Sequence, residues 1–261
     1  MTVTVSHIIF DVDGLLLDTE TVYTAVSSKI LESYGLKLTY ETKRKLMGRK
    51  PHDAAAVLVR HLAAPFTPEE WMASFNAHLT ADRWHAVACL PGAERLVLHL
   101  AKHNIPMAAA TGCCSHELEQ KMTNHQNIWR TINHAVASGD DPNTFADDEE
   151  MEKLEEQIRK SWPDNARQIK YGKPKPDIFL AAASRFPTPP VNMELVLVFE
   201  DSPLGVEAAV AAGMHVVWVP PPEEPPSDAP ETIPASCVSR VTRLRSLLDF
   251  KPEQFGIPPF D

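Results

Sequence analysis

Three short apolar runs, each ending in polar residues, constrain the fold most strongly. They are Val5 to Phe10 before Asp11-Val12-Asp13-Gly14, Ile105 to Ala110 before Thr111-Gly112, and Leu195 to Phe199 before Glu200-Asp201-Ser202. Runs of this length bounded by turn residues are typical of buried strands. Helix-like segments, Ala93 to His103 and Leu204 to Ala212, alternate with them. This alternation predicts an α/β fold with a Rossmann-like, mostly parallel sheet and helices on both faces.

The polar ends of these strands are expected to meet at one edge of the sheet. Ligands of open parallel sheets bind at the carboxyl ends of the strands. A fourth polar segment, Gly172-Lys173-Pro174-Lys175-Pro176-Asp177, precedes a predicted helix, with Pro176 at a plausible first-turn position. The sequence therefore predicts two aspartates, a threonine, a lysine and a further acidic pair around one site.

These residue types suit phosphoryl transfer. A carboxylate that attacks a phosphate needs a metal ion to offset the repulsion between anions, and a second acid to protonate the leaving oxygen. Asp11 and Asp13 can take the two carboxylate roles. An Asp-x-Asp-Gly sequence is also ordinary turn chemistry after a strand, so the interpretation depends on all four segments together.

The four segments, in this order, resemble the motifs of the haloacid dehalogenase-like (HAD) hydrolase superfamily, and the resemblance spans nearly the whole chain. It is strongest to the subfamily with a helical cap inserted after the first motif. This resemblance implies a magnesium-dependent phosphomonoesterase that works through an aspartyl-phosphate. The implied substrate is a phosphorylated sugar, polyol or nucleoside monophosphate, with pseudouridine-5'-phosphate as the first candidate.

Two other functions remain open at the level of sequence. A β-phosphoglucomutase-like phosphomutase can use the same pair of aspartates but returns the phosphoryl group to sugar instead of water. A catalytically silent binding module could also retain this fold. Release of free phosphate distinguishes the phosphatase from the mutase.

The resemblance also implies roles for individual residues. Asp11 is the expected nucleophile, and Asp13 the expected acid and base. Mg²⁺ is expected to be held by the Asp11 carboxylate, the Asp13 backbone carbonyl and Asp201, because these are hard oxygen ligands. Glu200 is interpreted as a metal ligand, a group that orients the ligands, or a cap of the strand end.

Phosphate contacts are expected from the second and third motifs. Thr111 supplies a hydroxyl and Gly112 a backbone amide at the end of the second strand. Lys173 matches the phosphate-binding lysine of the family, whereas Lys175 is interpreted as surface charge. The sequence thus predicts Thr111, Gly112 and Lys173 as phosphate-binding residues.

The predicted domains are a catalytic core formed by residues 1–15 and 89–261, and a helical cap formed by residues 16–88. Val22, Val26 and Ile30 have helical spacing, and Gly35 suits the end of that helix. In the resembling family the cap closes over the site, as mobile lids do. Arg49 and Lys50 are either substrate contacts of this cap or a solvated helix terminus.

Three segments of the core have distinctive patterns. Residues 140–170 form an unusually long link, within which Glu150 to Trp162 is predicted to be a surface helix. Val219 to Pro234 is rich in proline and is expected to be an extended surface segment. Ser239 to Phe250 has helical spacing and is expected to dock the C-terminal region on the core.

Composition narrows the range of partners and compartments. The formal net charge of −10 opposes binding to nucleic acids, whose backbones require clustered lysine and arginine. The sequence has no apolar stretch of about 18 residues, the length that a membrane-spanning helix needs. The four cysteines show no metal-ligand spacing and are interpreted as reduced thiols. We therefore expect a cytoplasmic enzyme with a small phosphorylated metabolite as its partner; the sequence predicts no particular protein partner.

Overall fold

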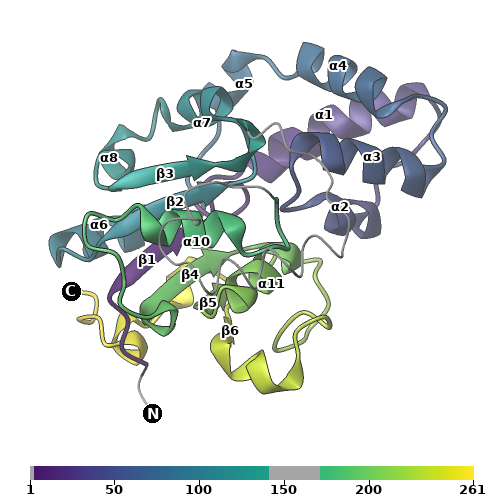
Figure 1. Cartoon of the computed structure of the whole chain (residues 1–261). Helices are drawn as coiled ribbons and strands as arrows, with labels where there is room; N and C mark the ends of the chain where they lie inside the picture. The colour runs from purple at the N-terminus through teal and green to yellow at the C-terminus, as the bar shows by residue number, and fades with distance from the viewer. Residues whose placement is uncertain (1–2, 141–170) are drawn as a thin grey trace.

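The computed structural model, which describes residues 3–140 and 171–261, contains a parallel sheet of six strands (Figure 1). Their order across the sheet is β3-β2-β1-β4-β5-β6. The strands are β1 (His7–Phe10), β2 (Met107–Thr111), β3 (His134–Ala137), β4 (Val196–Glu200), β5 (His215–Trp218) and β6 (Val241–Arg243). The predicted α/β fold with a parallel sheet is confirmed.

Strand β1 lies inside the sheet, between β2 and β4, and its four residues are all buried. It pairs with β2 on one side, with Ile8 opposite Met107, and with β4 on the other, with Phe10 opposite Phe199. Since alternate side chains of a strand point to opposite faces, Ile8 and Ile9 belong to different hydrophobic clusters. An apolar run buried on both faces is what a central parallel strand requires.

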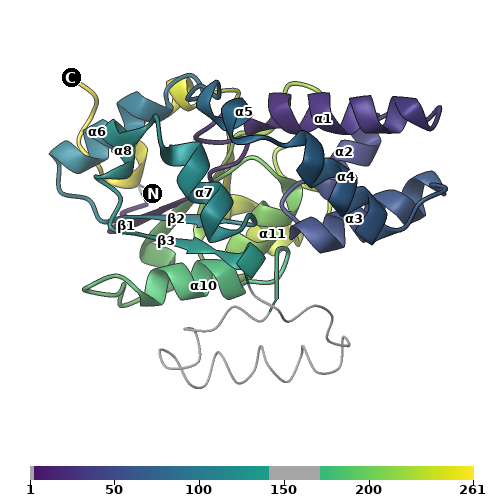
Figure 2. The same cartoon turned by 90° about the horizontal axis from the view of Figure 1, so that it is seen from above.

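Helices cover both faces of this sheet (Figure 2). One face packs against α10 (Asp177–Ser184) and α11 (Pro203–Ala211). The other packs against α6 (Ala93–Lys102), α7 (Ser115–Met122), α8 (Gln126–Trp129) and the C-terminal segment around Phe250 and Phe255. The predicted helices near Ala93 and Leu204 are therefore confirmed, each within one residue of its expected ends.

The strand order reverses at β1. From β1 the chain continues to β2 and β3 on one side of the sheet, and it then returns to β4, β5 and β6 on the other. The carboxyl ends of β1 and β4 thus flank the point at which a doubly wound sheet forms its binding crevice. Asp11 follows β1 directly, and Asp201 follows β4.

Five helices lie between β1 and α6 and extend beyond the carboxyl edge of the sheet (Figures 1 and 2). They are α1 (Thr19–Ser33), α2 (Tyr40–Leu46), α3 (Pro51–Leu62), α4 (Pro68–His78) and α5 (Ala81–His85). Val26, Leu58 and Trp71 belong to a hydrophobic cluster of α1, α3 and α4 that is separate from the clusters of the sheet. These helices therefore have a small core of their own.

Local signals explain where α1 begins and ends. The Asp18 side chain accepts a hydrogen bond from the Thr21 amide, as an N-cap residue does. Gly35 follows the helix with φ +70°, a left-handed conformation that glycine adopts without strain. The two segments that connect these helices to the sheet lie side by side. The Asp18 amide donates to the Ala88 carbonyl, and the Leu90 amide donates to the Leu16 carbonyl.

The prediction of helical structure over Ser239 to Phe250 is wrong. The segment instead begins at the end of a 3₁₀ turn, Ala235–Arg240, and contains β6 and a second 3₁₀ turn, Leu247–Asp249. Val241 pairs with Val216 of β5, so the sheet supplies the backbone hydrogen bonds that a helix would otherwise form internally. Leu247 and Phe250 nevertheless pack into the core, as the apolar spacing indicates.

The proline-rich segment 219–234 contains neither helix nor strand, as expected. Its Glu224 is buried, however, and accepts hydrogen bonds from Tyr40 (2.6 Å) and Arg44 (3.0 Å) of α2. The segment therefore fastens α2 to the sheet domain. The helix predicted over Glu150 to Trp162 lies outside the described residues, and no helix within the described ranges is long and apolar enough to cross a membrane.

Because His134 of β3 is partly buried, we expect the stability of the folded protein to decrease slightly at mildly acidic pH. Burial lowers its pKa from the ordinary value of 6.5. As the pH falls through 6.5, the unfolded chain takes up a proton that the folded chain does not, so stability falls. Between pH 7.5 and 5.5 the free energy of unfolding should therefore fall more in the wild type than in His134→Gln. The difference should stay below about 1.4 kcal/mol per pH unit, the limit for the uptake of one proton.

Urea unfolding at the two pH values measures this difference. The exposed His85, changed to Gln, is the matched control and should follow the wild type. Identical pH profiles for wild type and His134→Gln would refute the assignment.

Candidate active site

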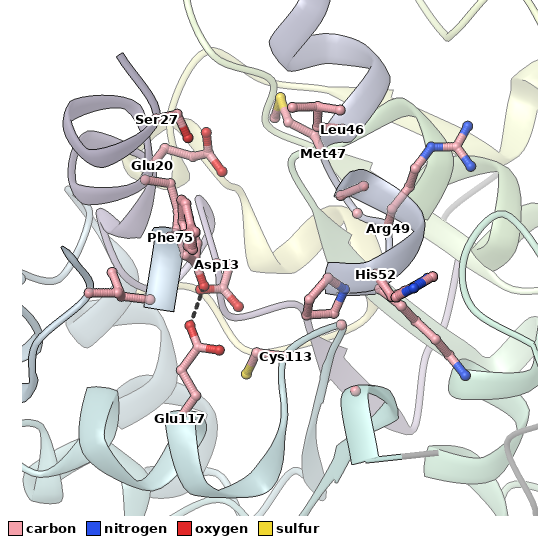
Figure 3. A pocket seen from close by; sticks show the side chains of 18 of the residues that line it. Asp13, Glu20, Ser27, Leu46, Met47, Arg49, His52, Phe75, Cys113 and Glu117 are labelled. Atoms are coloured by element: carbon pink, nitrogen blue, oxygen red, sulfur yellow. Dashed lines mark hydrogen bonds between the residues drawn. The ribbon is translucent and has the colours of Figure 1, made fainter. Parts of the chain in front are cut away.

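A cavity of about 560 Å³ lies between the carboxyl edge of the sheet and the helices α1 to α4 (Figure 3). Asp11, Asp13 and Asp201 line it from the sheet side. The opposite wall includes side chains of α1, α4, the end of α2 and the loop that follows it, among them Tyr23, Ser27, Leu46, Met47, Trp71, Phe75 and Asn76. The cavity thus has a carboxylate-rich floor and a largely apolar roof.

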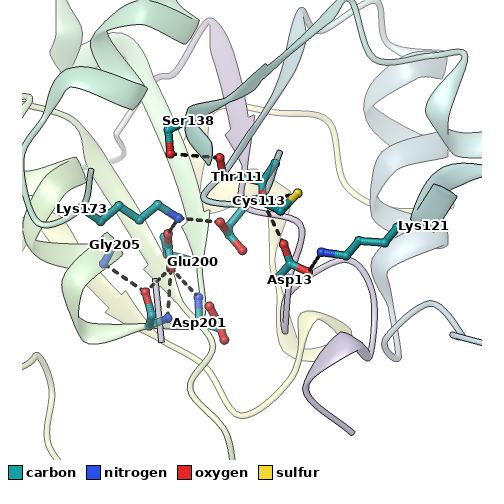
Figure 4. A network of polar contacts seen from close by, with 11 residues as sticks. Asp13, Thr111, Cys113, Lys121, Ser138, Lys173, Glu200, Asp201 and Gly205 are labelled. Atoms are coloured by element: carbon teal, nitrogen blue, oxygen red, sulfur yellow. Dashed lines mark hydrogen bonds and ion pairs between the residues drawn. The ribbon is translucent and has the colours of Figure 1, made fainter. Parts of the chain in front are cut away.

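Asp11 lies against Lys173, although the two residues are 162 positions apart. The Lys173 ammonium donates to Asp11 Oδ1 at 2.5 Å. It also donates to Glu200 Oε1 (Figure 4). Asp11, Lys173 and Glu200 are all buried. The structure therefore brings the first and third predicted motifs into direct contact at the end of β1.

Glu200 anchors this arrangement from behind. Its Oε2 accepts hydrogen bonds from the Asp201 amide (3.0 Å), the Ser202 amide (3.0 Å) and the Ser202 hydroxyl (3.1 Å). A Cβ at Gly205 would collide with its carboxylate, so a glycine is needed there for α11 to approach. Both Glu200 oxygens are thus committed to donors, and its side chain does not line the cavity.

Asp201 reaches the loop after β1. A Cβ at Gly14 would collide with Asp201 Oδ2, and Gly14 has φ +77°, which also favours glycine. The Trp218 indole donates to the Asp201 carbonyl at 2.9 Å and fixes the backbone there. Asp201 therefore lies next to the Asp11 loop, although the two residues follow different strands.

Three buried carboxyl groups, those of Asp11, Glu200 and Asp201, lie around the Lys173 ammonium. Burial raises the pKa of Asp11 to about 8, with Lys173 opposing the shift and Glu200 adding to it. Burial, followed by repulsion from Glu200 and Asp11, also raises the pKa of Asp201 well above its usual range. Such a site favours binding of a cation.

The donor atoms fit a hard divalent ion. Within the described residues, no three His, Cys, Asp or Glu side chains form a metal cluster. The predicted set requires only two carboxylates, Asp11 and Asp201, with the Asp13 backbone carbonyl. Oxygen ligands of this kind suit Mg²⁺, which commonly binds through one or two carboxylates and keeps several waters.

Asp13 is held differently from Asp11. Its Oδ2 accepts from the Thr111 hydroxyl at 2.8 Å, and its Oδ1 from the Lys121 ammonium at 2.6 Å (Figure 4). Burial acts to raise the pKa of Asp13, but the Lys121 charge and these hydrogen bonds outweigh it and lower the pKa below 3.8. Thr111, predicted as a phosphate contact, here directs its hydroxyl to Asp13.

The loop after α2 closes the opposite side of the cavity. Arg49 donates to the Lys45 carbonyl at 2.8 Å, and its backbone carbonyl lies 3.2 Å from the position of a Cβ at Gly112. Lys50 is buried, lines the cavity and packs its side chain over Gly172. Lys50 is therefore not a solvated helix terminus in this structure.

Sequence reasoning missed several polar residues of this site, among them Glu20, Tyr23, Glu117 and Lys121. All but Lys121 line the cavity. Glu20 pairs with Lys43 at 3.4 Å, and Tyr23, Glu117 and Lys121 contact one another beside Asp13. The available signal was position alone, since α7 begins four residues after Thr111 and must start beside the site.

Comparison with known proteins identifies the family. Residues 5–213 match the hydrolase family described as haloacid dehalogenase-like hydrolase. The chain therefore belongs to the HAD-like hydrolase family, as the resemblance of its four motifs indicated.

Two curated relatives are similar to nearly the whole chain. (DL)-glycerol-3-phosphatase 2 of Arabidopsis thaliana is 38% identical, with 98% of this chain and 93% of that protein covered. The Drosophila melanogaster protein named "Probable pseudouridine-5'-phosphatase" is also 38% identical, with coverage of 98% and 96%. This chain is thus similar over its full length to proteins with two different substrate names.

Solved structures support the fold. CbbY of Rhodobacter sphaeroides, in complex with phosphate, superposes with a TM-score of 0.65 at 19% identity, covering 94% of this chain and 96% of that chain. The β-phosphoglucomutase of Clostridium difficile superposes with a TM-score of 0.63 at 18% identity, covering 96% and 95%. At this level of identity the similarity concerns the fold alone.

Proposed function

We propose that this protein is a magnesium-dependent phosphomonoesterase that hydrolyses a small phosphorylated metabolite through an aspartyl-phosphate on Asp11. One observation carries the proposal: Asp11, in contact with Lys173, shares a cavity with a second carboxylate, Asp13, at the edge where β1 and β4 end. Membership of the family and the names of full-length relatives support a phosphatase.

The two aspartates divide the chemistry. The anionic phosphoryl group that binds beside Asp13 raises the pKa of its carboxyl group above that of the free enzyme, so Asp13 takes up a proton in the substrate complex. The Asp11 carboxylate attacks phosphorus, a new O–P bond forms, and the bond to the leaving oxygen breaks as Asp13 donates this proton to it. Asp13 then removes a proton from the water that attacks the aspartyl-phosphate. Phosphate leaves, and Asp11 returns as a carboxylate while Asp13 is again protonated.

The cation is needed because anions meet at this site. We propose that the Asp11 carboxylate, the Asp13 carbonyl and Asp201 hold Mg²⁺, which when bound offsets the charge of the carboxylates and the phosphate. The Lys173 ammonium, which contacts Asp11 and Glu200, neutralises a further part of that charge. Glu200 then serves to orient Lys173 and the turn after β4, since both of its oxygens already accept hydrogen bonds.

The helices α1 to α5 would act as the cap of this site, with residues 16–88 as the cap domain and residues 1–15 and 89–261 as the core. Arg49 and Lys50 are the proposed contacts to the substrate beyond its phosphoryl group. The cavity of about 560 Å³ lies within the range of small-molecule sites and has room for a sugar, a polyol or a nucleoside. The names of the relatives make glycerol 3-phosphate and pseudouridine-5'-phosphate the first substrates to test.

Phosphate release from a panel of sugar phosphates, polyol phosphates and nucleoside monophosphates tests the proposal. The protein should release phosphate from members of one class in the presence of Mg²⁺. Interconversion of hexose phosphates without net phosphate release would identify a mutase instead. Inertness toward every ester, with intact folding, would favour a binding protein.

Binding of Mg²⁺ should be visible without turnover. Because the ion binds only the folded site, a concentration about tenfold above its dissociation constant should add about 1.4 kcal/mol of stability, or about 3 °C in Tm. Chelation with EDTA should remove both this shift and phosphate release.

The Asp201→Asn variant tests the assignment of the metal ligands, since it should lose most of the thermal shift. Asp228→Asn, at an exposed position, is the matched control and should keep the shift. An equal shift in wild type and Asp201→Asn would place the ion elsewhere.

A further inference from the structure

Lys121 is a buried cation that the proposed chemistry has not yet used. It lies near the end of α7, and its side chain is 0% exposed. A lysine is almost never fully buried unless its charge is paired. Its position beside Asp13 therefore requires an explanation in terms of its partners.

The partners of Lys121 match the three protons of its ammonium group. The nitrogen lies 2.6 Å from Asp13 Oδ1, 2.6 Å from the Tyr23 hydroxyl and 3.0 Å from Glu117 Oε1. The Tyr23 hydroxyl in turn donates to Glu117 at 2.5 Å. The ammonium also lies over the Trp84 ring, 4.7 Å from its centroid. Lys121 is thus held from α1 and α7 while it holds Asp13.

This contact fixes the plane of the Asp13 carboxylate. Lys121 binds one of its oxygens and Thr111 the other, so rotation about the last side-chain bond would break a hydrogen bond to each. The Asp13 side chain still lines the cavity and is 19% exposed. Each carboxylate oxygen has two lone pairs, so either can exchange a proton with a ligand while the contact persists.

We propose that Lys121 is a positioning residue that orients Asp13 for proton transfer to the leaving oxygen, with Tyr23 and Glu117 holding Lys121 in place. This inference rests on the proposed function. In the substrate complex, where Asp13 holds the proton, negative charge grows on its carboxyl group as that proton passes to the leaving oxygen, and this group already faces two fixed donors. Preorganised donors of this kind stabilise the transition state more than the ground state. Lys121 itself keeps all its protons.

A purely structural role makes a different prediction. A packing defect at α7 would displace the whole site and slow every substrate by a similar factor. Loss of proton donation slows only those esters whose leaving group must be protonated. An alkoxide requires that proton, whereas p-nitrophenolate is stable enough to leave without it.

The test compares kcat/KM for p-nitrophenyl phosphate and for glycerol 3-phosphate, or another alkyl phosphate that the wild type hydrolyses. This parameter covers the steps up to departure of the leaving group, so the later attack by water does not affect it. Lys121→Met should lower kcat/KM for the alkyl phosphate by about 100-fold, within the usual range for acid–base catalysis. For p-nitrophenyl phosphate kcat/KM should fall by about 10-fold at most. Equal losses on both substrates, or no loss, would overturn the proposal.

Tyr23→Phe provides a second variant if Lys121→Met fails to fold. It removes one oxygen partner of Lys121 and keeps the aromatic ring, so the same selective loss should appear at about 10-fold. Lys29→Met, at an exposed position of α1, carries the same change of charge and should match the wild type on both substrates. A wild type inactive on every ester would refute the proposed function, whereas an active wild type with unselective variants would refute only the role of Lys121.

Discussion

Asp11→Asn should abolish phosphate release, with a loss of at least about 10³-fold in kcat, while the protein still folds. The amide that replaces the carboxylate cannot form the phosphoryl intermediate. Removal of the charge should not harm the fold, because the pKa of Asp11 is raised to about 8 by its burial. A raised carboxyl pKa means that the folded state loses stability as the pH rises from 3.8 to about 8.

Phosphate release and thermal unfolding in Mg²⁺-free buffer at pH 8 measure both effects. Asp11→Asn should be inactive and at least as stable as the wild type. Asp18→Asn is the matched control, because asparagine also caps helices well and the Asp18 side chain accepts its hydrogen bonds from Thr21, away from Asp11. Phosphatase activity that survives in Asp11→Asn would contradict the assignment of the nucleophile.

Lys173→Met should reduce both activity and stability. The variant leaves Asp11 and Glu200 buried without the ammonium that contacts both of them. Breaking a buried ion pair by removing one partner commonly costs about 3–5 kcal/mol. Because the phosphoryl group also loses a fixed positive charge, kcat/KM should fall by at least about 10²-fold.

Urea unfolding and phosphate release distinguish this effect from a general loss of surface charge. Lys175→Met changes a lysine two residues away in the same loop and should retain most of both properties. If Lys173→Met and Lys175→Met behaved alike, the contact of Lys173 with Asp11 would have no functional consequence.

The three fully buried apolar strands made the centre of the fold predictable. The runs that became β1, β2 and β4 are buried on both faces, so their composition alone indicates strands. β3, β5 and β6 were missed because each has only three or four residues, and β3 and β6 are only partly buried. Their pairing with neighbouring strands determines their structure, and the helical spacing after Val241 was misleading for this reason.

The candidate site was predictable where chemistry follows directly after a strand. Asp11, Asp13 and Asp201 all line the cavity, and Lys173 contacts Asp11. Lys121 was not predictable because the sequence of α7, Ser-His-Glu-Leu-Glu-Gln-Lys-Met, has the polarity of a surface helix. Its burial depends on Tyr23, which lies 98 positions away, and no local pattern reports such a contact.

The most direct measurement is an acid quench of the Asp13→Asn variant during reaction with p-nitrophenyl phosphate. This ester needs little help from an acid to lose its leaving group, but hydrolysis of the aspartyl-phosphate still needs the base. We predict a burst of one equivalent of p-nitrophenol and a phosphoryl group on the peptide that contains Asp11. Sustained turnover without phosphorylated Asp11, or a phosphoryl group on another residue, would contradict the account.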